Sequence, residues 1–322
     1  METMSLINDP DKRTDDPFKT FRSLSQDFQK AYFEWHTRGQ YEGVQEFGRF
    51  EDVLTKPPLR ERDDWYGEEL RVIDRHYRPL IDSRILEIGC GDGNLTWKLA
   101  ERSQSVVSCD VDPSAIELTR LRLKEKGLIG NVELLVGSAD YLASEESEAY
   151  DVVFLVQVLE HMPASMQGGL FDSVLRLVAP GGCLFVSTPN RWAIRDSHDT
   201  GRLLIHWFPR RIRIPLAKAM KWGIKGQDPC WPSPPVLHDY TSYRWMLKRV
   251  ESLFPGGMVP SRMLFYPTAE EWFREKVRIG SKGTKHIIRH AIRYLGDFFP
   301  LNYYFGDKVI FYKMPRGQTT LK

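Results

Sequence analysis

The stretch LEIGCGDGNLTW, residues 86–97, places glycines at three alternate positions directly after a short apolar run. The run at 84–88 is typical of a buried strand, and the residues from Asn94 onward are typical of a helix. Glycines between a strand and a helix allow positive φ and let a ligand lie against bare backbone. This turn therefore predicts a binding site, and a turn that serves packing alone is the alternative.

Strand and helix patterns alternate on the C-terminal side of this turn. Strands are predicted at 84–88, 105–109, 132–136, 150–156 and 183–187, with helices at 94–102, 113–126 and 168–178 between them. Strands that alternate with helices favour a parallel, doubly wound sheet. The run at 150–156, YDVVFLV, is apolar almost throughout, as in a strand that is covered on both faces. After residue 189 the pattern is less regular, and strand-like residues return at 258–265 and 308–313.

The composition is that of an ordinary globular protein. The chain has 322 residues, of which 42% are hydrophobic and 27% charged, and its formal net charge is +2. This length suits one large domain with additions or two small domains, and the small net charge gives no reason to expect nucleic acid as a partner. The sequence shows no secretory signal, no run of about 20 apolar residues and no Cys-x-x-Cys pair. We therefore expect a cytoplasmic protein without a structural zinc site.

Acidic side chains stand at the carboxyl ends of the predicted strands, which is where doubly wound sheets bind ligands. Asp110 ends the second strand, and Asp140 follows the third in the text GSADYL. A carboxylate at position 110 can accept two hydrogen bonds from ribose hydroxyls. Asp140 can accept one from an exocyclic amine, with Tyr141 against the base. Asp112 precedes Pro-Ser and is expected to be a helix cap.

The nearest rival to this interpretation is a dinucleotide-binding turn, which has the spacing G-x-G-x-x-G and holds a pyrophosphate on the helix N-terminus. This chain instead has G-x-G-x-G at Gly89, Gly91 and Gly93, and Glu87 two residues earlier disfavours a nearby anion. The pattern therefore favours a nucleoside cofactor without phosphates over a nicotinamide dinucleotide.

The motif E-x-G-x-G-x-G, the two acids and the texts YDVVFLVQVLEHM and LRLVAPGGCLFVSTPN resemble class I S-adenosylmethionine-dependent methyltransferases. The resemblance is closest to the quinone-biosynthesis O-methyltransferases of the small-molecule branch. It covers about residues 80–190 and, more loosely, 238–313. It implies an α/β fold with a doubly wound, seven-stranded, mostly parallel sheet, whose last strand, KVIFYK, is antiparallel. N-terminal helical and internal lid additions would accompany this sheet.

The resemblance also implies the cofactor and its contacts. S-adenosylmethionine would be bound, S-adenosylhomocysteine would be the product, and no metal is expected. The glycines would pass beneath the methionine part, Asp110 would take the ribose hydroxyls, and Gln157 would line the sulfonium region. The full set of cofactor-binding candidates is Glu87, Gly89, Gly91, Gly93, Asp110, Val111, Asp140, Tyr141, Gln157 and Val158.

Four segments are predicted along the chain. Residues 1–60 form an N-terminal helical extension or lid, and residues 61–190 form the cofactor-binding core. Residues 191–239 form a lid over the substrate. Residues 240–322 complete the sheet and carry a basic helical segment.

The predicted reaction is in-line transfer of a methyl group to a small molecule, most readily to a hydroxyl oxygen. His161, in the text LEHM, is the first candidate for a general base. The alternative bases are His198 and His238. The region 190–245 supplies candidate substrate residues, although many of its aromatic side chains are expected only to pack together: His206, Trp207, Tyr240 and Tyr243.

Other functions stay open at this point. They are methylation of a nitrogen in a small molecule, methylation of protein or RNA, and cofactor binding without catalysis. The residues after the fourth predicted strand read QVLE instead of an Asn-Pro-Pro-Tyr type of motif. Methylation of amino or RNA-base nitrogens in that style is therefore disfavoured.

Two basic, amphipathic stretches, residues 201–225 and 274–293, have no role in the predicted methyl transfer. Such stretches can lie on an anionic membrane, bind a lipid-linked substrate, hold a phosphate or carboxylate, or form a solvated basic face. Peripheral membrane contact is therefore an alternative to a purely cytoplasmic location. The oligomeric state is not predicted.

Overall fold

The computed structural model describes residues 24–37, 66–145, 148–196, 201–220, 238–278, 289–291, 293–294 and 307–318. Its strands are β1 (Arg84–Ile88), β2 (Ser105–Asp110), β3 (Val132–Val136), β4 (Tyr150–Val156), β5 (Val178–Ser187), β6 (Met258–Pro260) and β7 (Lys308–Lys313). The helices of the first half are α2 (Gln26–Thr37), α4 (Gly67–His76), α5 (Asn94–Ala100), α6 (Pro113–Lys126) and α7 (Ala139–Glu145). Those of the second half are α8 (Ala164–Leu177), α9 (Arg210–Ala219), α10 (Tyr243–Leu253) and α11 (Ala269–Arg278). Single 3-10 turns lie at η1 (Ile129–Asn131), η2 (Leu159–His161) and η3 (Ile205–Trp207).

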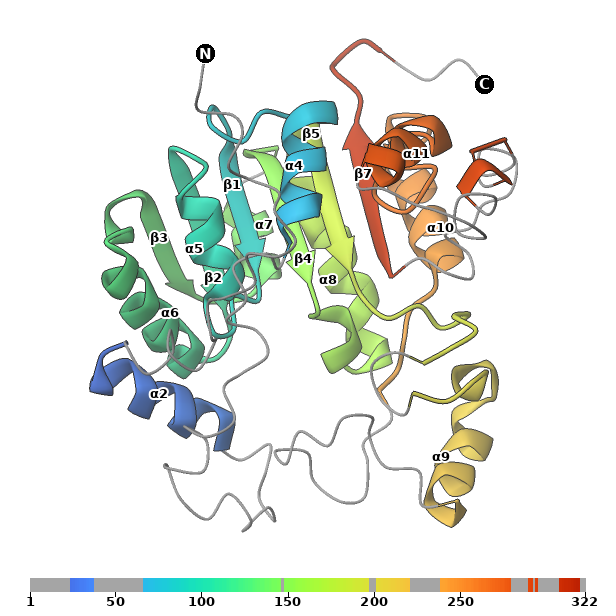
Figure 1. Ribbon diagram of the computed structural model, residues 1–322, viewed down its shortest axis with the longest axis horizontal. Coiled ribbons are helices and arrows are strands. Elements are labelled where there is room, and N and C mark those ends of the chain that lie inside the picture. Colours follow the sequence, from blue (N-terminus) through green and yellow to red (C-terminus); the bar gives the residue numbers. More distant parts are fainter. Residues whose placement is uncertain are drawn as a thin grey trace.

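The strands form one sheet in the order β3-β2-β1-β4-β5-β7-β6 (Figure 1). The pairs among β1 to β5 are parallel. Strand β7 is antiparallel to both of its neighbours, β5 and β6. The predicted α/β fold, with a mostly parallel sheet and an antiparallel last strand, is therefore confirmed.

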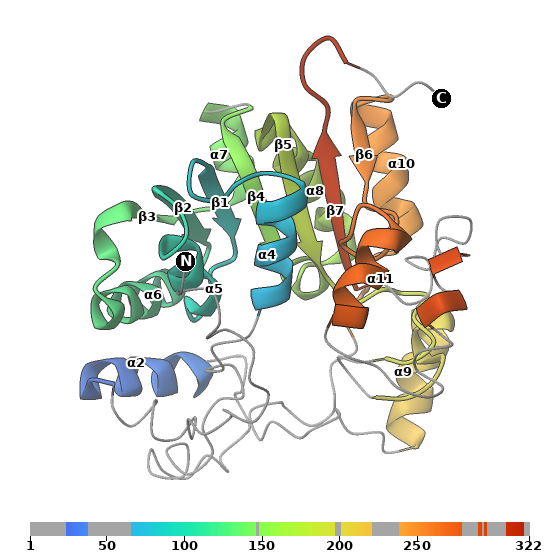
Figure 2. The same ribbon diagram turned by 45° about the horizontal axis from the view of Figure 1, so that its top comes forward.

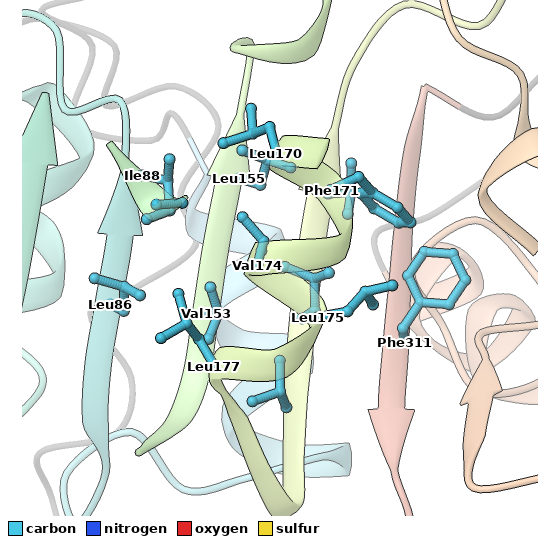
Figure 3. Packing of buried hydrophobic residues seen from close by; sticks show 14 of the residues in the cluster. Leu86, Ile88, Val153, Leu155, Leu170, Phe171, Val174, Leu175, Leu177 and Phe311 are labelled. Carbon is cyan, nitrogen blue, oxygen red and sulfur yellow. The ribbon is translucent and has the colours of Figure 1, made fainter. Parts of the chain in front are cut away.

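Alternate side chains of each strand face opposite layers of helices. On one face, residues such as Leu86 pack with α8 and α10, and on the other face residues such as Ile85 pack with α4, α5 and α11. Figure 3 shows the first of these layers, where helix α8 lies across the central strands. Its labelled residues include Val153, Leu155, Leu170, Phe171, Val174 and Phe311. Both layers of helices cover β4, which explains why the sequence of this strand is apolar almost throughout.

Several predicted elements have different bounds in the structure, and strands β5 and β6 differ most. Strand β5 begins at Val178, which pairs with Tyr150, and regular pairing resumes only at Cys183, so residues 179–182 form a bulge. Strand β6 ends at Pro260 instead of continuing to residue 265. There the Ser261 N–H still donates to the backbone oxygen of Ile310 at 2.7 Å, but the N–H of Ile310 donates to the Ser261 hydroxyl at 3.0 Å instead of to a backbone oxygen.

Two helices lie beyond the carboxyl ends of the parallel strands, on opposite flanks. Both views place α2 on the side of α6 and α9 on the far side, near the connection to α10 (Figures 1 and 2). Helix α2 packs on α6 through Phe28, Tyr32 and Leu118. The segments predicted to cover the site thus border the edge of the sheet where ligands are expected.

No helix in the described part of the chain combines the length and apolar character that a bilayer span requires. The division into four segments stays a prediction.

Candidate active site

The turn after β1 has an unusual backbone and little space around it. Gly89, Gly91 and Gly93 have φ of 78°, 53° and 73°. A Cβ atom at Gly89 would lie 2.4 Å from Cγ2 of Val158, and one at Gly93 would lie 2.9 Å from the Cα of Thr119. The turn is therefore wedged between the end of β4 and helix α6, which only glycine allows.

Most N–H groups of the turn donate to acceptors within the chain. The Gly91 N–H donates to Oδ2 of Asp110 at 3.0 Å, and the Asn94 N–H donates to Oδ1 of Asp92 at 3.2 Å. In a dinucleotide turn, such N–H groups hold the pyrophosphate. Here five of them donate within the chain: Gly89, Cys90, Gly91, Gly93 and Asn94. This arrangement fits a ligand that touches bare backbone without phosphate oxygens.

Asp110, at the end of β2, accepts backbone N–H groups on both carboxylate oxygens. Oδ2 accepts from Gly91 and Oδ1 from Asp112, each at 3.0 Å. Burial raises the pKa of Asp110, and these hydrogen bonds oppose that rise. Each carboxylate oxygen can accept more than one hydrogen bond. Asp110 can therefore hold the turn and still accept two hydroxyl groups of a ligand.

Asp112 accepts the N–H of Ser114 at 2.8 Å and is the N-cap of α6, which confirms its predicted role. Its other oxygen accepts Nε1–H of Trp35 at 3.1 Å. The edge of the Trp35 ring lies only 3.7 Å from the position of a Cβ at Gly91. Helix α2 thus places an indole against the glycine turn. No motif or spacing in the sequence indicates this contact, because 77 positions separate Trp35 from Asp112.

Glu87 lies buried in β1 behind the turn. Its Oε2 accepts the hydroxyls of Thr96 at 2.6 Å and Ser108 at 2.8 Å. Burial raises the pKa of Glu87 to about 8, against the effect of these hydrogen bonds. The carboxyl is therefore mostly protonated at pH 7 and repels an anion only weakly. The occupied N–H groups are thus a stronger argument against a diphosphate than the charge at position 87.

The variant Glu87→Gln tests the raised pKa of Glu87 through the pH dependence of stability. Because the pKa of Glu87 rises from 4.5 unfolded to about 8 folded, its contribution to stability is fully present below pH 4.5 and is lost as the pH rises to 8. The slope for one such group is at most about 1.4 kcal/mol per pH unit. We expect urea unfolding of both proteins at pH 5.5, 7 and 8.5 to show that the free energy of unfolding of the variant increases relative to that of the wild type as the pH rises. A constant difference between the two proteins would contradict the raised pKa.

The ends of β2 and β3 carry exposed apolar side chains beside the predicted acids. Val111 is 71% exposed and Tyr141 is 61% exposed. The N–H of Gly137 donates to the backbone oxygen of Asp110 at 2.9 Å, which holds the two strand ends together. Asp140 is exposed in the first turn of α7 and accepts the Ser173 hydroxyl at 2.5 Å. An exposed apolar surface flanked by carboxylates suits an uncharged base.

The end of β4 faces the turn across the point where the strand order reverses, between β1 and β4. Gln157 has a φ of 53° although it is not glycine, and its N–H donates to the oxygen of Ser187 at 2.7 Å. Val158 follows it and contacts Gly89. A side chain held in the left-handed region is typical of functional sites, where the surrounding structure enforces strain.

Two candidate bases meet just beyond β4. The rings of His161, in η2, and His238, before α10, are in T-shaped contact with centroids 4.9 Å apart. His161 is exposed, whereas His238 is almost buried. The neighbouring Glu160 is buried and accepts the Thr188 hydroxyl at 3.0 Å. His198 lies outside the described residues.

His206 is held in a buried network. Its Nδ1 faces Nη1 of Arg213 at 3.2 Å, and its Nε2 faces Oδ2 of Asp196 at 3.4 Å. The ring stacks on Tyr240, whose hydroxyl donates to Asp196 at 3.0 Å. Trp207 donates Nε1–H to two backbone oxygens of the lid, and Tyr243 is buried at the start of α10. In the described structure His206, Trp207 and Tyr240 pack with residues of the predicted lid, whereas Tyr243 packs in the core beside α8. The contact of these side chains with a substrate stays a prediction.

Several cations of the two basic stretches have acidic partners. Arg274 and Arg293 both contact Glu270, and Lys276 contacts Glu68. Residues 221–225, 279–288 and 292 lie outside the described chain. Within it, no three metal-binding side chains gather into one cluster. Membrane contact and the expectation that no metal is needed stay predictions.

Comparison with known proteins agrees with this geometry. Residues 85–182 match the family described as "Methyltransferase domain". Over 122 residues, 38% of this chain, it is 36% identical to a ubiquinone biosynthesis O-methyltransferase of Nitrosospira multiformis and covers 49% of that protein. Over 144 residues, 45% of this chain, it is 34% identical to the protein of that name from Aliivibrio fischeri and covers 56% of it. The chain thus spans about half the length of the curated relatives it matches.

Among solved structures, the chain is similar to an O-methyltransferase family protein from Burkholderia thailandensis, with a TM-score of 0.46 and 14% identity. The match covers 94% of this chain and 72% of that one.

Proposed function

We propose that this chain, whose residues 85–182 match the family described as "Methyltransferase domain", uses S-adenosylmethionine to move a methyl group to a hydroxyl oxygen of a small molecule. The observation that carries the proposal is the glycine turn, in which five N–H groups already donate within the chain and whose neighbour is the acceptor Asp110. The named O-methyltransferase relatives support a small molecule as the acceptor.

The residues of the turn would hold the cofactor. Asp110 would accept the two ribose hydroxyls, and the bare backbone at Gly91 would lie along the cofactor. Trp35 would cover the turn and exclude water, and Val158 would form the opposite wall. When bound, S-adenosylmethionine supplies a methyl group that its sulfonium has already activated. The protein must then align the acceptor oxygen and receive its proton.

His161 would receive that proton. The ring of His238 would orient the ring of His161 through the contact between them. General-base assistance is worth roughly 100-fold to 10,000-fold in rate. We therefore expect His161→Gln to lower turnover by about 100-fold while the affinity for S-adenosylhomocysteine stays within twofold. A general base acts in its unprotonated form, so we expect the turnover of the wild type to rise with pH and that of His161→Gln not to do so. His238→Gln is the matched control, and it should reduce turnover less and keep the pH dependence. Full activity of His161→Gln would exclude this residue as the base.

A transfer assay tests the proposed function directly. The protein is incubated with S-adenosylmethionine carrying a labelled methyl group and with small-molecule extracts of the producing cell. The labelled product is then identified by mass spectrometry. We expect label on an oxygen of a small molecule, and none with Asp110→Ala. Label only in protein or RNA, or on nitrogen, would contradict the proposal.

A further inference from the structure

A pocket of about 270 Å³ lies between the starts of α8, α9 and α10. It adjoins the candidate bases, since His238 immediately precedes Asp239 in its wall. The glycine turn contributes no residue to its lining. The residues that line it are Ala164, Gln167, Arg191, Arg210, Arg213, Asp239, Tyr240, Thr241, Ser242 and Trp245.

The described lining of this pocket is strongly positive. It contains three arginines, which stay charged at any physiological pH, against one acid. That acid, Asp239, contacts both Arg210 and Arg213. Arg191 has no acidic partner among the described residues. The start of α10, next to Ser242, adds the partial positive charge of a helix N-terminus.

Among the buried polar atoms of the lining, Nε of Arg191 and Oγ1 of Thr241 have no hydrogen-bond partner within the described chain. Thr241 is only 5% exposed. The two residues are joined through their backbones, since the N–H of Arg191 donates to the Thr241 oxygen at 2.8 Å. Buried polar groups are nearly always hydrogen-bonded in folded proteins. Both groups can donate to an anionic oxygen, so the pocket is suited to an anion.

Side chains in the walls of the pocket donate hydrogen bonds to the segments that carry the candidate bases. Nε2–H of Gln167 donates to the backbone oxygens of Leu159 at 2.9 Å and Asp239 at 2.7 Å. Nη2–H of Arg213 donates to the backbone oxygen of His238 at 3.0 Å. An anion in the pocket would therefore sit at a fixed position relative to the ring pair formed by His161 and His238.

We propose that this pocket recognises an anionic group, a carboxylate or a phosphoryl group, on the molecule that accepts the methyl group. Arg191 and Thr241 donate to the anion, and Arg210 and Arg213 supply further positive charge. That the anion belongs to the methyl acceptor rests on the proposed function, whereas binding of the anion itself does not.

Binding of small probes tests the proposal. Phenyl phosphate, benzoate and the uncharged benzyl alcohol are titrated into the full-length protein by calorimetry. We expect phenyl phosphate, benzoate or both to bind, and benzyl alcohol not to bind. Arg191→Gln should weaken anion binding at least tenfold. Arg211→Gln removes the same charge from an exposed position on α9 outside the pocket, and it should change the affinity less than twofold.

Thr241→Val separates binding from folding. Replacing an unsatisfied buried hydroxyl by a methyl group of the same shape is neutral or stabilising. We therefore expect this variant to be at least as resistant to urea as the wild type, yet to bind the anion several-fold more weakly. A merely structural role for Thr241 would leave the anion affinity unchanged.

S-adenosylhomocysteine is titrated into the same samples as a separate test of the cofactor site. A protein that binds S-adenosylhomocysteine but neither anion overturns the proposed pocket and leaves the proposed function standing. Equal anion affinity in the wild type and Arg191→Gln also overturns it. A protein that binds the anions but not S-adenosylhomocysteine overturns the proposed function and supports the anion site.

Discussion

Gly93→Ala is expected to lower the free energy of unfolding by roughly 2–5 kcal/mol and to abolish cofactor binding. The left-handed backbone costs a side chain about 1–2 kcal/mol. The new Cβ would also lie 2.9 Å from the Cα of Thr119, a backbone atom that cannot rotate away. Overpacking of this kind adds about 1–3 kcal/mol. Urea unfolding and calorimetric titration with S-adenosylhomocysteine measure the two effects.

Gly127→Ala is the matched control. Gly127 ends α6 with a φ of 69°, close to that of Gly93, but a Cβ there meets nothing within 4 Å. This variant should lose only the backbone part, about 1–2 kcal/mol, and should bind S-adenosylhomocysteine as the wild type does. Equal losses of stability in the two variants would show that the contact with α6 does not constrain the turn.

Asp110→Ala is expected to weaken binding of S-adenosylhomocysteine by 100-fold or more. Hydrogen bonds to a charged group are worth about 1.5–3 kcal/mol each, and two of them to the ribose would be lost. The N–H groups of Gly91 and Asp112 would also lose their acceptor, so the turn itself would loosen. Asp110→Asn keeps one carbonyl acceptor and should fall between the alanine variant and the wild type.

Asp74→Ala is the control for Asp110→Ala. Asp74 also accepts a backbone N–H, that of Leu80 at 2.9 Å, but it lies before β1 at the opposite edge of the sheet. Asp74→Ala also leaves a backbone N–H without its side-chain acceptor, yet it should leave the affinity for S-adenosylhomocysteine unchanged. Wild-type affinity in Asp110→Ala would remove the ribose contact from the account.

The core of the fold could be predicted from the sequence because local patterns determine it. Strands β1, β3, β4 and β7 have the predicted bounds, and α6 begins at its Asp-Pro-Ser signal and ends at Gly127. These elements have strong apolar patterns and clear capping residues, so their local preferences agree with their burial. The early start of β5 was missed because Val178 pairs with Tyr150 across a bulge, and a bulge depends on the partner strand.

Of the candidate site, only the residues that come directly after a strand could be predicted from the sequence. The glycine turn, Asp110 and Gln157 all lie at the carboxyl edge, as their places in the sequence require. Trp35 and the pair of Arg191 and Thr241 could not be found in this way. Their positions depend on how α2 and the lid fold back over the sheet, and tertiary contacts of that kind have no short-range signal. The protonated state of Glu87 likewise depends on burial.

The most direct measurement is calorimetric titration of the unmodified protein with S-adenosylhomocysteine and, separately, with NAD. Both ligands carry an adenosine, and only NAD carries a diphosphate. Because the N–H groups of the turn are occupied by the chain's own acceptors, we predict saturable binding of S-adenosylhomocysteine and none of NAD. Saturable binding of NAD, or no binding of S-adenosylhomocysteine, would contradict the account.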